Sequence, residues 1–351
     1  MGKKMKAYAL KNLECSLSSS GGAFPTIVKE FFQMTKQHGI SKLLVYGAAW
    51  QKDFSVKHER IDYEQGIERF SGSKYVWSEI HDIANQIIRD LIDGSAVVFS
   101  GTPCQVDAIK KSVSKYGVDS KWLLLIDLIC HGTPNVKLWS DYFNLIQSHY
   151  STNITNICFR DKMGNSRSGG KLVLTFSDGT RIENDTFLKH YMRLFSRNLS
   201  LRKGCFTCRY RNTELKRPGD ITVGDFWGVK EIFPNFDKCG DVSLVLTNSE
   251  KGEKLFNRIV VGSKHEVMVG ECQDDSFLKY NPHLYKLTQM PKNYEQFWTD
   301  YKQMDFTSFE NKWAKEPLIA RIKVILSNIA SVLGIKYKLK SFLHDMVSNK
   351  K

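Results

Sequence analysis

Over the first 150 residues, hydrophobic positions follow two regular patterns in turn. Short, nearly continuous apolar runs of strand length alternate with stretches in which apolar residues recur at helical spacing. Continuous apolar strands joined by helices are typical of a parallel sheet that helices cover on both faces. We therefore predict an α/β fold built on a mixed, largely parallel sheet. The predicted strands span 43–48, 96–99 and 122–129, and the predicted helices span 24–38, 79–92, 106–116 and 136–149.

The pattern changes after about residue 151. Strands are predicted over 154–159 and 171–183, the second divided by a hairpin turn at Ser177-Asp178-Gly179. Short strands follow at 221–224 and 242–247, and a helix at 250–260. After about residue 291 no strand is apparent, and apolar residues between Leu318 and Leu333 recur on one helical face. We therefore predict a principal domain over 1–290 and a basic, helical C-terminal extension over 291–351.

Composition narrows the class of protein. The chain has 351 residues, of which 42% are hydrophobic and 25% charged, and this is ordinary for a globular protein. No apolar run approaches the roughly 20 residues that span a bilayer. The N-terminal lysines are not followed by an apolar run, so a signal peptide is not expected. We expect a cytoplasmic protein, in which thiols serve as ligands, nucleophiles or buried apolar groups rather than disulfides.

The charge balance points to an acidic partner. Lys plus Arg number 51 and Asp plus Glu 37, which gives a formal net charge of +14. A phosphorylated cofactor, an acidic electron donor, nucleic acid and an anionic membrane surface would all fit. No zinc-finger spacing, helix-turn-helix signature or RRM motif is present, so nucleic-acid binding is not expected. The basic residues near the C-terminus could contact a membrane surface, but a helix packed on its own domain is the favoured interpretation.

Four of the eight cysteines occur where ligands are expected. Cys104 and Cys130 each follow a predicted parallel strand, and the carboxyl ends of such strands open on one edge of the sheet. The Cys205-x-x-Cys208 spacing lets both sulfurs face one metal centre. Together they make the four ligands of a 4Fe-4S cluster or a zinc ion, and the strand-end positions favour the cluster. The other cysteines have no ligand spacing and are expected to be apolar core residues: Cys15, Cys158, Cys239 and Cys272.

Three further groups suit a ligand. The Ser18–Ala23 segment precedes a helix, where small residues and backbone N–H groups favour a phosphate, although a simple N-cap would look the same. Arg160-Asp161-Lys162 follows a strand and could orient a polar ligand, or form a solvated surface pair. The Gly224–Gly228 turn holds Phe and Trp and suits a ring ligand, or is only a turn. Possible proton donors or anion contacts elsewhere are Asp107, His131 and Lys74.

Eight motifs in a fixed order resemble one family. They are SSSGGAF at 18–24, GSKYV at 72–76, SGTPCQV at 100–106, DLICHGTP at 127–134, FRDK at 159–162, KGCFTC at 203–208, DITVGDFWG at 220–228 and DVSLVLTNSEKGE at 241–253. Over about residues 7–290 the chain is similar to the coenzyme F420 hydrogenase/dehydrogenase beta-subunit family. The similarity is to bacterial members found with genes for polysaccharides and cell-surface glycans.

The resemblance implies a flavoenzyme that carries FAD and a 4Fe-4S cluster. Its cluster ligands would be Cys104, Cys130, Cys205 and Cys208. His131, Arg160 and Lys162 would contact substrate or flavin, and the imidazole of His131 has a usual pKa suited to proton transfer. The expected flavin contacts are Ser19, Ser20, Gly21, Gly22, Ser73, Lys74, Gly101 and Thr102.

Many bacterial members begin with a ferredoxin-like domain, but here only Cys15 precedes the serine-glycine segment. Electrons are therefore expected from a ferredoxin-like donor or a separate iron–sulfur subunit. They would pass through the cluster and FAD to a small organic substrate or the deazaflavin coenzyme, with a setting in surface polysaccharide biosynthesis. Two alternatives stay open. One is a non-catalytic, zinc-stapled assembly protein of a glycan locus, and the other is a transferase with Cys104 as nucleophile beside His131.

Overall fold

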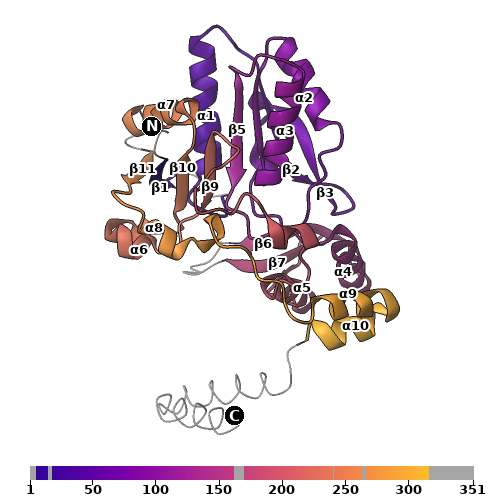
Figure 1. Cartoon of the computed structure of the whole chain (residues 1–351). Helices are drawn as coiled ribbons and strands as arrows, with labels where there is room; N and C mark the ends of the chain where they lie inside the picture. Colours follow the sequence, from indigo (N-terminus) through magenta and orange to yellow (C-terminus); the bar gives the residue numbers. More distant parts are fainter. Residues whose placement is uncertain (1–4, 15–17, 162–169, 240, 263–265, 316–351) are drawn as a thin grey trace. The chain divides into compact units, whose positions relative to one another are not determined.

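The computed structural model describes residues 5–14, 18–161, 170–239, 241–262 and 266–315. The chain divides into two compact units, Met1–Lys292 and Asn293–Lys351. Figure 1 labels most of the helices and strands. The strands of the first unit are β1 (Lys6–Asn12), β2 (Leu43–Trp50), β3 (Val56–Asp62), β4 (Ala96–Gly101), β5 (Leu123–Leu128), β6 (Ile154–Asp161), β7 (Lys171–Phe176), β8 (Arg181–Glu183), β9 (Ile221–Asp225), β10 (Ser243–Thr247) and β11 (Val267–Glu271). Its α-helices are α1 (Ala23–Gln37), α2 (Ile83–Ile92), α3 (Pro103–Lys115), α4 (Val136–His149), α5 (Thr186–Ser196), α6 (Val229–Ile232), α7 (Glu250–Gly262) and α8 (Phe277–Tyr280).

Eight of the described strands form one mixed sheet, in the spatial order β11-β1-β10-β9-β5-β4-β2-β3. The four central strands β9, β5, β4 and β2 pair in parallel, and the flanking strands pair antiparallel. The predicted α/β class with a mixed sheet is therefore confirmed. The sequence pattern did not reveal β1, β3 or β11. Strands β3 and β11 are the two edges of the sheet, and β3 carries several charged residues.

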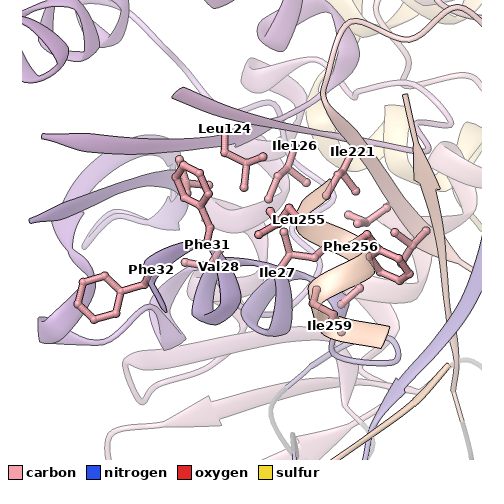
Figure 2. Packing of buried hydrophobic residues seen from close by; sticks show 14 of the residues in the cluster. Ile27, Val28, Phe31, Phe32, Leu124, Ile126, Ile221, Leu255, Phe256 and Ile259 are labelled. Atoms are coloured by element: carbon pink, nitrogen blue, oxygen red, sulfur yellow. The ribbon is translucent and has the colours of Figure 1, made fainter. Parts of the chain in front are cut away.

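Side chains of the central strands alternate between two helical layers. Val97 of β4 lies in the cluster formed with α2 and α3, whereas its neighbour Val98 lies in the cluster formed with α1 and α7. Figure 2 shows the latter cluster, in which Phe31 of α1 and Phe256 of α7 lie on the same side of the sheet as Ile126 of β5. Because helices cover both faces, polar chemistry is confined to the ends of the strands.

Strands β4 and β5 are neighbours joined by α3. Their parallel register pairs Val97 with Leu123 and Gly101 with Asp127, so the two strands end at the same edge. The prediction that the segments after these strands meet is confirmed. Pro103 occupies the first turn of α3, and a capping box with Thr102 as N-cap residue fixes the start of the helix.

A second sheet, β6-β7-β8, is antiparallel and lies in the chain between β5 and β9. The predicted hairpin over 171–183 is confirmed, since β7 and β8 pair antiparallel across the turn. Trp139 of α4, Phe159 of β6 and Tyr191 of α5 form an aromatic cluster whose ring centroids lie 4.9 to 6.1 Å apart. This cluster holds β6 in place just before Arg160.

In the second unit, α9 (Tyr294–Gln303) packs on α10 (Phe306–Trp313). The ring centroid of Phe297 lies 5.0 Å from that of Phe309 and 5.3 Å from that of Trp313. The predicted amphipathic face at 318–333 and the basic residues up to Lys351 fall outside the described residues. Within the described ranges, no helix has the length and apolar character needed to cross a membrane.

Candidate functional site

A cavity of about 480 Å³ lies where the central strands end. Its volume is within the roughly 300–1,000 Å³ typical of small-molecule sites. Predicted ligand-binding residues from distant parts of the sequence meet in its wall. The lining includes the segments 18–20, 71–76, 100–102, 128–134 and 223–225, and with them Ser19, Ser20, Ser73, Lys74, Gly101, Thr102 and His131.

The serine-glycine segment is fastened to the sheet at Gly21. A Cβ at this residue would lie 2.2 Å from the carbonyl oxygen of Leu10 and 2.4 Å from the backbone nitrogen of Ser243, so only glycine fits. The N–H of Gly21 donates to Ser243 Oγ at 2.9 Å. Gly22, with φ of 83°, begins α1 without a side-chain cap. Gly21 and Gly22 do not belong to the cavity lining, and their predicted flavin contact stays a prediction.

The two predicted flavin segments contact each other. Ser19 Oγ accepts a hydrogen bond from the backbone N–H of Ser73 at 2.8 Å. Lys74, the next residue, lines the cavity, and its Nζ donates to the carbonyls of Ser71 at 3.0 Å and Gly72 at 3.4 Å. Burial lowers the pKa of Lys74 to about 8. No carboxylate among the described residues pairs with it, so an anionic group in the cavity would remove the cost of burying its charge.

The end of β4 forms one wall of the cavity, and side-chain hydrogen bonds hold it in place. The backbone N–H and the Oγ1 of Thr102 both donate to Gln105 Oε1, each at 2.9 Å. Gln105 Nε2 in turn donates to the carbonyl of Ser78 at 2.7 Å. Thr102 Oγ1 also lies 3.2 Å from the sulfur of Cys104, in the first turn of α3. The residues that join the cavity to Cys104 are therefore held by a chain of hydrogen bonds.

The four predicted ligand cysteines are brought together. Coulombic interaction with Cys205 and Cys208 contributes to the raised pKa of Cys104, and interaction with Cys205 and Cys104 contributes to that of Cys130. Desolvation is the larger cause in both cases and raises the pKa of Cys130 to about 12. All four are free thiols. Across the residues that the structure describes, no group of three or more His, Cys, Asp or Glu side chains is arranged to hold a single metal ion.

Backbone contacts fix the cysteine loop to the segment after β5. The N–H of Thr133 donates to the sulfur of Cys205 at 3.5 Å, and the N–H of Arg202 donates to the carbonyl of Thr133 at 3.0 Å. Gly132 has φ of 128°, and a Cβ there would lie 2.9 Å from Leu201 and 3.4 Å from the Cβ of Cys205. The glycine in the Cys130-His131-Gly132 sequence thus permits the close approach of the two cysteine-bearing segments.

His131 lies in an ordered hydrogen-bond network. Asn198 Nδ2 donates to the carbonyl of Gln289 at 3.2 Å, which leaves Oδ1 to accept from His131 Nε2 at 2.8 Å. This assigns the proton to Nε2, and His131 Nδ1 then accepts from His283 Nε2 at 3.2 Å. Burial lowers the pKa of both rings, that of His283 to about 4. Both histidines are therefore neutral at pH 7.

Two other predicted groups meet in one ion pair. Arg160 Nη1 donates to Asp225 Oδ2 at 2.5 Å, and the Arg160 side chain is 9% exposed. Trp227, in the same turn as Asp225, lines the cavity although it is 57% exposed, which suits a ring that stacks on a flat ligand.

Two other predicted residues are not found at the cavity. Lys162 falls outside the described residues. Asp107 lies on α3 away from the cavity, where it pairs with Lys111 and Arg209.

Sequence reasoning missed several residues of the site. His58 comes from the edge strand β3, with Nδ1 2.8 Å from Ser78 Oγ and Nε2 2.9 Å from the carbonyl of Ser100. His283 and Asn198 reach His131 from far along the chain, and no motif marks them. Arg211 was also missed, although a basic residue three positions after Cys208 was a usable signal.

Four cysteines were expected in the core. Of these, Cys158 and Cys272 are half-buried, and the side chains of Cys15 and Cys239 are not among those that the structure describes.

The chemistry of the site follows from one shared residue. Cys130 belongs to the group of four thiols and also lines the cavity. Thiolates bind soft metal centres. The adjoining cavity offers the ammonium group of Lys74, several serine hydroxyls and the exposed indole of Trp227. A metal centre at the cysteines and a ring ligand in the cavity would therefore share a wall.

Comparisons with known proteins agree with this arrangement. Residues 94–269, half of the chain, match the family model that describes the C terminus of the beta subunit in coenzyme F420 hydrogenase/dehydrogenase. No curated protein matches the chain. Among solved structures, a chain of the F420-reducing NiFe hydrogenase complex from Methanosarcina barkeri is similar, with a TM-score of 0.50 and 15% identity. The match covers 86% of this chain and 94% of that chain, and at this identity it concerns the fold.

The matched segment runs from just before β4 into β11 and includes all four grouped cysteines. His131 and Arg160 lie within it, whereas the serine-glycine segment and Lys74 precede it. The family match and the shared fold together carry the assignment made from the ordered motifs. This chain belongs to the coenzyme F420 hydrogenase/dehydrogenase beta-subunit family.

Proposed function

We propose that this protein is an iron–sulfur flavoprotein oxidoreductase. In the proposed arrangement, Cys104, Cys130, Cys205 and Cys208 hold a 4Fe-4S cluster and the cavity holds FAD beside an organic substrate. The observation that carries the proposal is the position of Cys130, which belongs to the group of thiols and lines the cavity. Family membership supports an oxidoreductase, and the solved relative is named as part of a complex that reduces coenzyme F420.

The donor set fits a cluster. Four free thiols on three separate segments of the chain interact electrostatically. A 4Fe-4S cluster takes one thiolate at each iron, so its four ligands would be spread around a group larger than a single metal ion. Thr133 N–H, 3.5 Å from the sulfur of Cys205, is the kind of donor that stabilises a thiolate ligand. When bound, the cluster and FAD would supply one-electron and hydride chemistry respectively.

The cavity also fits a dinucleotide. The start of α1 presents backbone N–H groups without a side-chain cap, beside Ser19 and Ser20. Lys74 lies in the same wall with only carbonyl partners among the described residues. A pyrophosphate placed here would meet both a helix N-terminus and an ammonium group. Trp227 is available to stack on a ring, and the Arg160–Asp225 ion pair bounds the cavity near it.

The histidine network next to Cys130 has a defined arrangement of protons. His131 holds a proton on Nε2, where Asn198 accepts it, and His283 donates to Nδ1. We propose that this network orients the Cys130-His131 segment and fixes which ring nitrogen of His131 carries a proton. The acceptor is proposed to be a small organic molecule or the deazaflavin coenzyme, and a role in surface polysaccharide biosynthesis stays a prediction from the resemblance.

A thiol-dependent transferase is less well supported. A nucleophilic cysteine needs a lowered pKa and a neighbouring base. The pKa of Cys104 is raised, mainly by desolvation of its sulfur, and its described hydrogen-bond partner is the hydroxyl of Thr102. His131, the base expected for this chemistry, is instead engaged with Asn198 and His283.

We propose that the electron donor is a separate acidic protein that docks on a basic surface beside the cysteines. This basic surface is a hollow on the outside of α3 and of the loop after Cys208, and its exposed cations are Lys110, Lys111, Arg209 and Lys216. Asp107 and Glu214 neutralise part of this charge and leave an excess of positive charge. Arg209 directly follows Cys208, so a donor bound here would lie close to the proposed cluster.

Metal and flavin analysis of anaerobically purified protein tests the proposal. Wild-type protein is expected to contain about four irons and one flavin per chain, with broad visible absorption. Cys205→Ser and Cys208→Ser are expected to lose the iron. The matched control Cys272→Ser, at a half-buried cysteine next to β11, should keep it. One zinc per chain without flavin would instead support the assembly-protein alternative.

A further inference from the structure

Two buried arginines near the cysteines differ in one respect. Arg217 has a carboxylate partner, since its Nη2 donates to Asp127 Oδ1 at 2.5 Å and both side chains are almost fully buried. Arg211, six residues earlier, is 6% exposed, and no carboxylate among the described residues pairs with it. A buried guanidinium without a counter-charge is costly, so the contrast needs an explanation.

The hydrogen-bond partners of Arg211 are neutral, and one of its N–H groups has no acceptor. Nη2 donates to the carbonyl of Cys130 at 2.5 Å, and Nη1 donates to Thr288 Oγ1 and, at 3.4 Å, to the carbonyl of Lys286. Thr288 Oγ1 donates to the carbonyl of His131 at 3.1 Å. The Nε atom of Arg211 is buried and has no hydrogen-bond partner. The side chain therefore clamps the Cys130-His131 backbone while its charge and one N–H stay unsatisfied.

The nearest compensation for this charge is the group of thiols. Three of them, Cys130, Cys208 and Cys205, interact coulombically with Arg211 in a direction that favours its charged form. The backbone N–H of Arg211 also donates to the carbonyl of Cys208 at 3.2 Å. Thiolates that carry a metal centre would give Arg211 the negative charge that its protein partners lack.

We propose that Arg211 is the fixed counter-charge of the cysteine centre, a positioning residue that holds the Cys130 backbone and favours the more negative, reduced state of the centre. The inference rests on the proposed function, because it takes the centre to be a thiolate-ligated cluster. A positive charge in a poorly solvated setting acts strongly on a neighbouring group of thiolates. Removing it makes the centre harder to reduce and lowers its midpoint potential.

The test is a redox titration of reconstituted full-length protein, followed by electron paramagnetic resonance. Arg211→Gln and Arg211→Met are expected to bind iron and to show a lower midpoint potential than wild type. Arg211→Lys keeps the charge and is expected to restore most of the potential. Arg209→Gln is the matched control, because it removes an exposed positive charge next to Cys208 and should leave the potential nearly unchanged. An unchanged potential in Arg211→Gln overturns the proposal.

Thermal unfolding gives a second readout if Arg211→Met binds no iron. In metal-free protein, Arg211→Met is expected to be as stable as wild type or more stable, since an uncompensated buried charge is gone. With zinc alone bound to the thiols, the order should reverse. Equal destabilisation with and without zinc would show that Arg211 is only a backbone clamp. If wild-type protein holds zinc and no iron, the proposed function fails, and the zinc comparison still decides the role of Arg211.

Discussion

Arg217 donates two hydrogen bonds to Oδ1 of Asp127, from Nη2 at 2.5 Å and from Nε at 3.1 Å. The side chains are 1% and 0% exposed. Nη2 also donates to the carbonyl of Leu128 at 2.8 Å, and Nη1 to that of Tyr210 at 3.1 Å. Asp127 Oδ2 accepts from the N–H of Gly219 at 2.9 Å. This ion pair thus joins the end of β5, just before Cys130, to the segment that follows the Cys205–Cys208 pair.

Removing one partner of this ion pair should strongly destabilise the folded protein. Asp127→Leu leaves the Arg217 charge buried and uncompensated, and Arg217→Met does the same to Asp127, so each is expected to cost about 3–5 kcal/mol of unfolding free energy. The double variant should recover part of this loss, because neither charge then remains. Urea unfolding of the metal-free protein measures the three values and their coupling.

The exposed pair Glu214–Lys216 provides the comparison, since its side chains are 66% and 81% exposed. Glu214→Gln is expected to change the unfolding free energy far less than either substitution in the buried pair, because water screens the exposed charges. If Asp127→Leu and Arg217→Met cost no more than this surface change, the buried pair does not hold the cysteine segment in place.

Lys74 makes flavin binding depend on pH. Its pKa in the free protein is lowered to about 8 by burial, so the ammonium that would meet an anionic group is lost as pH rises through 8. We expect the Kd for FAD to increase between pH 7 and pH 9 in wild type. A charge-assisted hydrogen bond contributes about 1.5–3 kcal/mol, so Lys74→Met should weaken binding roughly 10- to 100-fold at pH 7 and remove the pH dependence.

Fluorescence titration with FAD measures these constants, and Lys74→Arg should stay tight at pH 9 because a guanidinium keeps its proton. Lys57→Met, at an exposed position of β3, is the matched control. Wild-type affinity that is flat from pH 7 to pH 9 would falsify the role given to Lys74.

His58 makes the protein sensitive to acid. Burial lowers its pKa from 6.5 to about 4, against the opposing effect of hydrogen bonding to the backbone. In the unfolded chain His58 becomes protonated below about pH 6.5, whereas in the folded protein it becomes protonated only near pH 4. Stability contributed by the neutral ring is therefore fully present above pH 6.5 and is lost as pH falls to 4, by about 3 kcal/mol at most.

We expect His58→Gln to be less stable than wild type at pH 7 but to lose less stability between pH 7 and pH 4.5. Urea unfolding across this range gives the slopes. His38→Gln, at an exposed histidine at the end of α1, is the companion variant, because it removes a histidine without removing a buried ring. Equal slopes for His58→Gln and wild type would assign the acid sensitivity to other groups.

Much of the central fold could be predicted because its signals are local. The continuous apolar strands around Val97 and Leu124 and the helices between them indicate the parallel centre of the sheet. The positions of Cys104 and Cys130 after two such strands then place both thiols at one edge. Strand β3 could not be found in this way, since VKHERID carries charges at an edge of the sheet and shows no clear apolar alternation.

The site was predictable only where a residue stands next to a strong element. Gly101 ends the buried strand β4 and Cys130 lies just after β5, so the topology of the fold fixes their place. His283 reaches His131 from 152 positions away, within a single 3-10 turn at Pro282–Leu284 that no sequence motif marks. The pairing of Arg160 with Asp225 joins two motifs that were noticed separately, because contact between distant loops depends on packing that periodicity does not encode.

Charge reversal on the basic surface should slow electron transfer from an acidic donor. Lys111→Glu combined with Lys216→Glu changes the sign of charge at two exposed positions beside the cysteine loop. Complementary charges act mainly on association rates and weaken with salt. We expect the second-order rate constant for reduction by a purified acidic ferredoxin to fall about tenfold or more at low ionic strength, and the difference to shrink in high salt.

Two controls separate location from total charge and docking from redox competence. Lys29→Glu combined with Lys254→Glu makes the same change in net charge on α1 and α7, at exposed lysines away from the basic surface, and should leave the rate near wild type. Reduction by dithionite needs no docking protein and should be equal in all variants. The basic surface is not the docking site if both double variants slow the ferredoxin reaction equally, because only the overall charge would then matter.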